Sequence, residues 1–123
     1  MDGRNKPNKT GLTRLFRAAA CSWKGFNYLW QSEEAFRQEV VLCVFLLPVG
    51  WVLGESGVER ALLIGSVLLI PLAEVLNTAI ECIVDRIGPE FHELSGNAKD
   101  LGSSAVMLSI CITVVVWVLV LLS

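Results

Sequence analysis

Three acids and one amide recur at helical spacing in the second half of the chain. Glu74, Asn77, Glu81 and Asp85 follow one another at intervals of 3, 4 and 4 residues, which places them on one face of a helix. Several carboxylates on one face can hold a hard cation such as Mg²⁺, and the cation can hold a phosphate. The deepest carboxylate can accept a proton from a hydroxyl group. This acidic stripe therefore indicates metal and phosphate chemistry.

Two other interpretations of the acidic stripe remain open at this point. A structural one pairs the acids with basic partners, but only Arg86 and Lys99 are near in sequence. The other is ion or proton transport, because acids inside membrane spans are common in transporters. The last apolar segment offers few polar groups to line such a pathway: Ser103, Ser104, Ser109 and Thr113.

The elements that must position the stripe are apolar. Hydrophobic residues make up 54% of the 123 residues and charged residues only 18%, below the roughly 25% of a soluble domain. Residues 101–123 carry no charge, and such a run can cross a bilayer core of about 30 Å. This composition argues against a soluble enzyme and a disordered chain. The net charge of −2 argues against a nucleic-acid partner.

Four helices are expected. After a polar tail over residues 1–9, apolar positions spaced by 3 and 4 residues predict an amphipathic helix from Thr10 to about Trp30, and its basic residues favour the membrane surface. Three transmembrane helices are predicted over about residues 35–53, 60–85 and 102–122, with a polar connection at 90–100 that turns at Ser95-Gly96. The expected architecture is an all-α membrane protein, with one domain over residues 1–123.

Lysine and arginine counts predict the orientation. Seven of the ten precede the first span or lie at its start, one lies in the first loop, two lie around the second loop, and none follows the last span. Because basic residues stay in the cytoplasm, we expect a cytoplasmic N-terminus and a C-terminus on the periplasmic side. The seven are Arg4, Lys6, Lys9, Arg14, Arg17, Lys24 and Arg37.

The chain resembles the small integral-membrane diacylglycerol kinases of bacteria over nearly its whole length. The most specific stretch runs from Glu74 to Asp100 and includes Glu74-Val-Leu-Asn77-Thr-Ala-Ile-Glu81 and His92-Glu93-Leu94-Ser95-Gly96. Further matches are Ser22-Trp23-Lys24-Gly25 and Ala35-Phe36-Arg37-Gln38-Glu39. The resemblance implies a homotrimer in the bacterial inner membrane, with active sites between subunits near the cytoplasmic surface.

The resemblance also implies transfer of phosphate from MgATP to the free hydroxyl of diacylglycerol. It makes Glu74 the catalytic base, and it makes Glu33 and Glu81 the carboxylates that hold Mg²⁺ and ATP. The other implied nucleotide residues are Arg14, Glu90, His92, Lys99 and Asp100. The implied lipid-binding residues are Ala19, Trp23, Arg37, Asn77 and Ser103, together with Glu74 itself.

Two alternatives remain beside this expectation. A related kinase acts on undecaprenol, a long polyprenyl alcohol, and would use the same mechanism. The Ser22–Gly25 and Phe36–Glu39 segments favour the diacylglycerol type. The alternative from another class is a trimeric membrane protein or ion pathway without enzymatic activity, which would consume no ATP.

Overall fold

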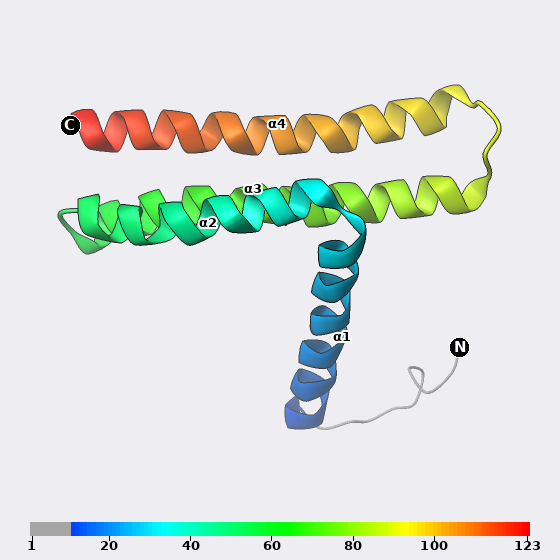
Figure 1. Ribbon diagram of the computed structural model, residues 1–123, viewed down its shortest axis with the longest axis horizontal. Helices are drawn as coiled ribbons and strands as arrows, with labels where there is room; N and C mark the ends of the chain where they lie inside the picture. Colours follow the sequence, from blue (N-terminus) through cyan, green and yellow to red (C-terminus); the bar gives the residue numbers. More distant parts are fainter. Residues whose placement is uncertain (1–10) are drawn as a thin grey trace. The chain divides into compact units, whose positions relative to one another are not determined.

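Four α-helices make up the part of the chain that the structure describes. The computed structural model describes residues 11–123 and contains α1 (Gly11–Ser32), α2 (Glu34–Leu53), α3 (Gly57–Ile87) and α4 (Glu93–Leu122) (Figure 1). This confirms the expected all-helical fold. The predicted tail, with Arg4, Lys6 and Lys9, lies outside the described residues, as does Thr10.

Three of these helices are long and apolar enough to cross a membrane. The mean hydropathy of the most apolar window is 1.7 in α2, 1.9 in α3 and 3.0 in α4. Successive helices run in opposite directions (Figure 1), so the start of α2, the end of α3 and the start of α4 lie toward the same end. The chain is therefore a multi-pass membrane protein with three spans.

The polar connection predicted over residues 90–100 is wrong for most of its length. The connection spans only 88–92, and α4 begins at Glu93. His92 caps the helix, because its Nδ1 accepts a hydrogen bond of 3.0 Å from the backbone N–H of Leu94. The backbone N–H of Gly96 donates to the His92 carbonyl at 3.1 Å, so the expected Ser95-Gly96 turn lies inside the helix. A capped first turn outweighs the weak helix propensity of serine and glycine.

A short turn of residues 54–56 joins α2 to α3 at the opposite end. Ser56 caps α3, since its hydroxyl accepts a hydrogen bond of 3.1 Å from the Glu59 N–H. Arg60 donates through Nε to the Trp51 carbonyl at 2.9 Å, and its guanidinium lies 4.7 Å from the centre of the Trp51 ring. A side chain at Gly54 would collide with Arg60, so this turn depends on glycine.

Helix α3 is the central helix of the three, packing against both α2 and α4. Leu63 and Val67 are completely buried on it. Two side chains of α4 bond to α3 backbone carbonyls: Thr113 Oγ1 donates to Ser66 at 2.8 Å, and Trp117 Nε1 donates to Leu63 at 3.0 Å. Pro71 interrupts the hydrogen bonding of α3 without ending the helix.

Helix α1 forms a separate compact unit with residues up to Glu33. The positions that define its predicted apolar stripe are all exposed within the chain. They are Leu12, Phe16, Ala19, Trp23, Phe26 and Trp30. These exposed side chains can contact a membrane or another copy of the chain.

Candidate active site

Glu74 is a buried carboxylate in the middle of α3. Only 5% of its surface is exposed, and Thr78, one turn further, donates a long hydrogen bond of 3.4 Å from Oγ1 to Glu74 Oε2. A single hydroxyl donor satisfies little of the hydrogen-bonding capacity of a carboxylate. Glu74 therefore keeps accepting capacity for a proton or a hydroxyl group.

Asn77 lies one turn beyond Glu74, where α3 and α4 approach closely. The side chain is buried, and its Oδ1 atom has no hydrogen-bond partner among the described residues. Gly102 of α4 lies opposite, and a Cβ atom at that position would collide with Asn77 Oδ1. The absence of a side chain at Gly102 thus leaves the Asn77 amide free to receive a donor.

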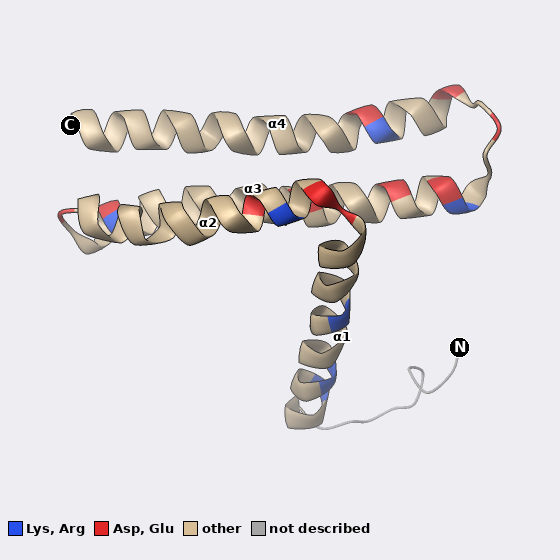
Figure 2. Ribbon diagram, in the orientation of Figure 1, with Lys and Arg blue, Asp and Glu red and all other residues tan. Residues whose placement is uncertain are grey.

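The acidic stripe becomes more exposed toward the end of α3. Glu81 is half-buried, whereas Asp85 is exposed and pairs with Lys99 of α4 at 2.8 Å. Glu81 is also near enough to Lys99 for their charges to interact. Figure 2 shows the charged residues of α4 near its connection to α3, whereas α3 carries charges both toward that connection and at its opposite end. The structure thus brings predicted metal and nucleotide residues, Glu81 and Lys99, to one place.

The remaining predicted residues of this end are exposed. They are Glu90 in the connection, His92 at the cap, and Asp100 and Ser103 in the first turns of α4. His92 has a structural role as the α4 cap, and the residue is exposed. These positions belong to the same polar end as Lys99, where a soluble nucleotide can reach them.

The predicted residues before α2 belong to the other compact unit. Arg14, Ala19 and Trp23 are exposed on α1, and Glu33 is a half-buried residue after it. Arg37 lies on α2 and lines an open hollow of about 390 Å³ with Glu34, Gln38 and Val41. Because an acidic, a basic and an apolar side chain all line this hollow, it suits the boundary between lipid and water.

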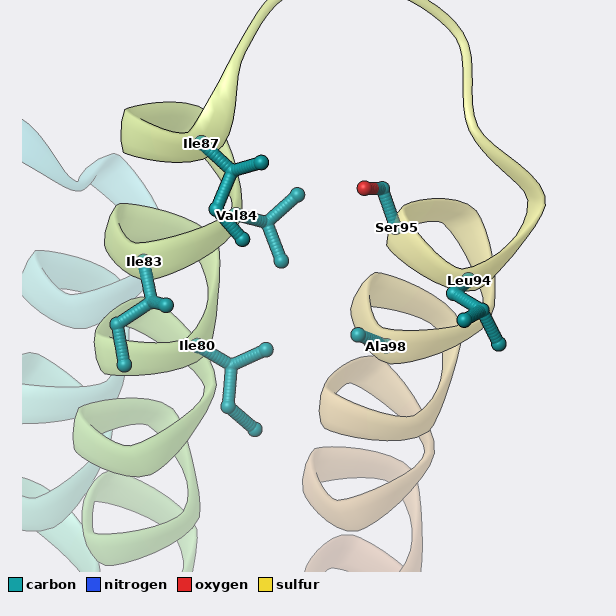
Figure 3. Close-up of a pocket in the computed structure, with 7 residues that line it drawn as sticks. All are labelled: Ile80, Ile83, Val84, Ile87, Leu94, Ser95 and Ala98. Atoms are coloured by element: carbon teal, nitrogen blue, oxygen red, sulfur yellow. The ribbon is translucent and has the colours of Figure 1, made fainter.

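An apolar pocket of about 330 Å³ separates the ends of α3 and α4. Figure 3 shows Ile80 and Val84 of α3 pointing toward the side of α4 that carries Ser95 and Ala98. Its lining is Ile80, Ile83, Val84, Ile87, Leu94, Ser95 and Ala98. Because no charged side chain lines it, this pocket does not suit phosphate or a metal ion.

The carboxylates fit a magnesium ion that arrives with a nucleotide. Residues 11–123 contain no group of three or more acids, histidines and cysteines placed to hold a metal alone. Mg²⁺ commonly binds through one or two carboxylates plus substrate phosphates and waters. Glu81 is a half-buried carboxylate that can supply an oxygen ligand to the metal. The nearby Lys99 can supply a positive charge for phosphate. The donor set therefore suits Mg²⁺ bound to ATP better than a resident ion.

Glu39 was missed as a candidate site residue. It lies on α2, near enough to Glu74 of α3 for their charges to interact. Its Oε1 atom is buried without a hydrogen-bond partner among the described residues. One signal could have identified it: Glu39 is the last charged residue before the uncharged run 40–54, and an acid within a membrane span is costly and therefore indicates a functional site.

Comparison with known proteins gives these carboxylates a context. The family model for prokaryotic diacylglycerol kinase matches residues 20–121. The chain belongs to the prokaryotic diacylglycerol kinase family. It is 48% identical to a diacylglycerol kinase of Escherichia coli K12, over 94% of this chain and 95% of the relative. It is 47% identical to that of Haemophilus influenzae, over 88% and 92%, and 46% identical to that of Pseudomonas aeruginosa, over 93% of both chains.

Membership of the diacylglycerol kinase family explains the arrangement of charges. Phosphoryl transfer depends mainly on positioning and on neutralising phosphate charge. The buried Glu74, the half-buried Glu81 and the exposed Lys99 form a gradient from apolar surroundings to water. A lipid hydroxyl and a soluble nucleotide can approach such a gradient from opposite sides.

Proposed function

We propose that this chain transfers the γ-phosphate of ATP to the free hydroxyl of 1,2-diacylglycerol and produces phosphatidic acid, in phospholipid metabolism and recycling. The family match, with relatives aligned over nearly their whole length, carries this proposal. The site supports it, because one buried carboxylate lies along α3 from a second carboxylate and a lysine that suit a nucleotide.

Glu74 is the proposed catalytic base. The lipid hydroxyl loses its proton to the Glu74 carboxylate as its oxygen attacks the γ-phosphorus, and the bond from that phosphorus to the β-phosphate oxygen breaks. Asn77 orients the lipid beside the base through its unpartnered amide oxygen. Further lipid contacts are assigned by resemblance to Ala19, Trp23, Arg37 and Ser103.

Glu33 and Glu81 are the proposed metal carboxylates, and Mg²⁺ bound with ATP would reduce the charge of the phosphates there. Lys99 adds a positive charge at the same end of the helices. Arg14, Glu90, His92 and Asp100 complete the proposed nucleotide site by resemblance. Because these residues lie outside the uncharged spans, ATP can bind from the cytoplasm while the lipid keeps its acyl chains in the bilayer.

Glu81→Gln is expected to raise the Mg²⁺ concentration needed for half-maximal activity by about tenfold. The amide keeps the shape of the side chain but supplies a weaker, uncharged metal ligand. Phosphate transfer measured across a Mg²⁺ titration at saturating ATP checks this. Glu59→Gln, at a half-buried acid at the opposite end of α3, is the control. An unchanged Mg²⁺ dependence in Glu81→Gln would contradict the metal assignment.

A homotrimer is the proposed assembly, with active sites between subunits. Within residues 11–123 only six hydrophobic residues are buried, so most apolar side chains need lipid or another subunit around them. We infer that residues 1–123 form one membrane kinase domain, in which α1 lies on the membrane surface as an amphipathic helix. The molecular mass of the protein in detergent, corrected for bound detergent, tests the trimer.

The bacterial inner membrane is the proposed location, with a cytoplasmic N-terminus and a periplasmic C-terminus. Arg86 and Lys99 lie at the end of the helices that also holds the start of α2 and Arg37, whereas Arg60 lies at the other end. This distribution follows the tendency of basic residues to remain in the cytoplasm. It places the nucleotide residues where ATP is available.

The proposed activity is tested by ATP-dependent phosphorylation in detergent micelles, with diacylglycerol and undecaprenol offered separately, with and without Mg²⁺. We expect Mg²⁺-dependent transfer mainly to diacylglycerol. Transfer mainly to undecaprenol would retain the mechanism and change the substrate. No transfer to either lipid from a folded protein would contradict the assignment as a kinase.

A further inference from the structure

The ion pair between Asp85 of α3 and Lys99 of α4 joins two helices at the end that carries the proposed nucleotide residues. Asp85 Oδ1 lies 2.8 Å from Lys99 Nζ, and the side chains are 67% and 44% exposed, respectively. Lys99 is one of the proposed nucleotide residues, whereas Asp85 has no assigned role. The proposed site therefore leaves this contact unexplained.

Apolar packing does little to restrain Lys99 at this level of the helices. The pocket of about 330 Å³ between the ends of α3 and α4 is lined by Val84 and Ala98 (Figure 3), which directly precede Asp85 and Lys99 in the chain. A lysine side chain has many rotamers in such surroundings, and holding it in one of them costs conformational entropy. The Asp85 carboxylate restrains the ammonium group that apolar contacts do not.

The position of Asp85 on α3 also places the ammonium group close to a metal carboxylate. Asp85 follows Glu81 by four residues, so the two carboxylates lie on the same helix face, about 6 Å apart along the axis. An ammonium group held at Asp85 is therefore beside the proposed position of Mg²⁺ and the phosphates. Of its three N–H donors, the Asp85 contact occupies one, and two remain for phosphate oxygens.

We propose that Asp85 is a positioning residue for the nucleotide: its carboxylate holds Lys99 Nζ beside Glu81, so that the ammonium group is in place before the phosphates of MgATP arrive. This inference rests on the proposed role of Lys99 in the nucleotide site. Asp85 acts through Lys99, without contacting ATP or the metal. Its effect is to reduce the entropy that Lys99 loses when ATP binds.

The sign of the effect separates positioning from simple electrostatics. Asp85 is a negative charge near an anionic ligand, so removing that charge would by itself favour ATP. Loss of a positioning group acts in the opposite direction, because an unrestrained Lys99 must then be ordered by ATP binding. A higher KM for ATP after removal of the Asp85 charge therefore identifies the positioning role.

The test compares Asp85→Asn with wild type in the full-length protein in micelles, at saturating diacylglycerol and Mg²⁺. We expect KM for ATP to rise about threefold to fivefold, since exposed ion pairs are modest in strength. The kcat value and the KM for diacylglycerol should change less than about twofold, because an ammonium group that contacts ATP equally in the ground and transition states affects KM alone.

Glu93→Gln is the matched control, since Glu93 is an exposed acid in the first turn of α4. It removes the same charge from the same end and should leave KM for ATP at or below the wild-type value. Thermal unfolding in the same detergent should be unchanged in Asp85→Asn and in the control.

Lys99→Met separates failure of this proposal from failure of the proposed function. It should raise KM for ATP more than Asp85→Asn does, and adding Asp85→Asn to it should raise KM little further, because both substitutions remove the same contact. Wild-type KM for ATP in Lys99→Met would contradict the proposed nucleotide site.

Three outcomes would overturn the positioning role itself while Lys99→Met still weakens ATP binding. An unchanged or lowered KM for ATP in Asp85→Asn would show that Asp85 does not assist Lys99. A lower unfolding temperature with a loss in kcat would make the ion pair a structural link between α3 and α4. A raised Mg²⁺ requirement would make Asp85 a metal ligand.

Discussion

Glu74→Gln is expected to lower kcat for diacylglycerol by at least about a hundredfold, because general-base catalysis contributes roughly 10²- to 10⁴-fold and an amide cannot accept the proton. The substitution keeps the volume of the side chain. It also keeps a carbonyl oxygen that can accept the hydrogen bond from Thr78. The loss should therefore appear in kcat and kcat/KM, with little change in the affinity for ATP.

The measurement is steady-state phosphate transfer in micelles, together with thermal unfolding and size in the same detergent. Glu55→Gln is a matched control, since Glu55 is an exposed acid in the α2–α3 turn at the opposite end of the helices. It should retain wild-type turnover. Near-normal turnover in a folded Glu74→Gln protein would refute the general-base assignment.

Gly102→Ala is expected to reduce kcat by about tenfold to a hundredfold while leaving the protein folded. The added Cβ atom would occupy the space of Asn77 Oδ1. Because Oδ1 is the end of a side chain that can rotate, relief of the collision costs little stability but displaces the amide. Misplacement of a substrate-positioning group by about 1 Å can cost 10²-fold in rate.

Gly96→Ala is the matched control, since it lies in the same helix and a Cβ atom there meets no other atom within 4 Å. It should keep full activity and gain up to about 1 kcal/mol in stability from helix propensity. If Gly102→Ala acts through Asn77, adding it to Asn77→Ala should lower kcat little further, because two mutations that remove the same interaction are not additive. Full additivity in the double variant would contradict this coupling.

The sequence predicted the local features of the fold because they repeat along the chain. The run of uncharged residues from Leu101 predicted the last span, and α4 crosses as a single helix. The spacing of the acidic stripe predicted one helix face, and Glu74 and Asn77 are both buried on α3. Period and composition are properties of neighbouring residues, so no tertiary information was needed.

The start of α4 was mispredicted because composition and capping disagree there. The segment around Ser95-Gly96 has the composition of a turn, yet it is helical from Glu93. The His92 cap and the hydrogen bonds of the first turn outweigh local propensity. Nothing in a residue count shows that such a cap will form.

The amino-acid sequence by itself determined which helices form, how many of them can cross a membrane, and which family the acidic stripe resembles. Only the tertiary structure decided which residues from different helices meet: Gly102 with Asn77, and Lys99 with Asp85. Partners within one helix follow from a fixed period of 3.6 residues. Partners between helices depend on the axial register and rotation at which their side chains pack, which no single helix specifies.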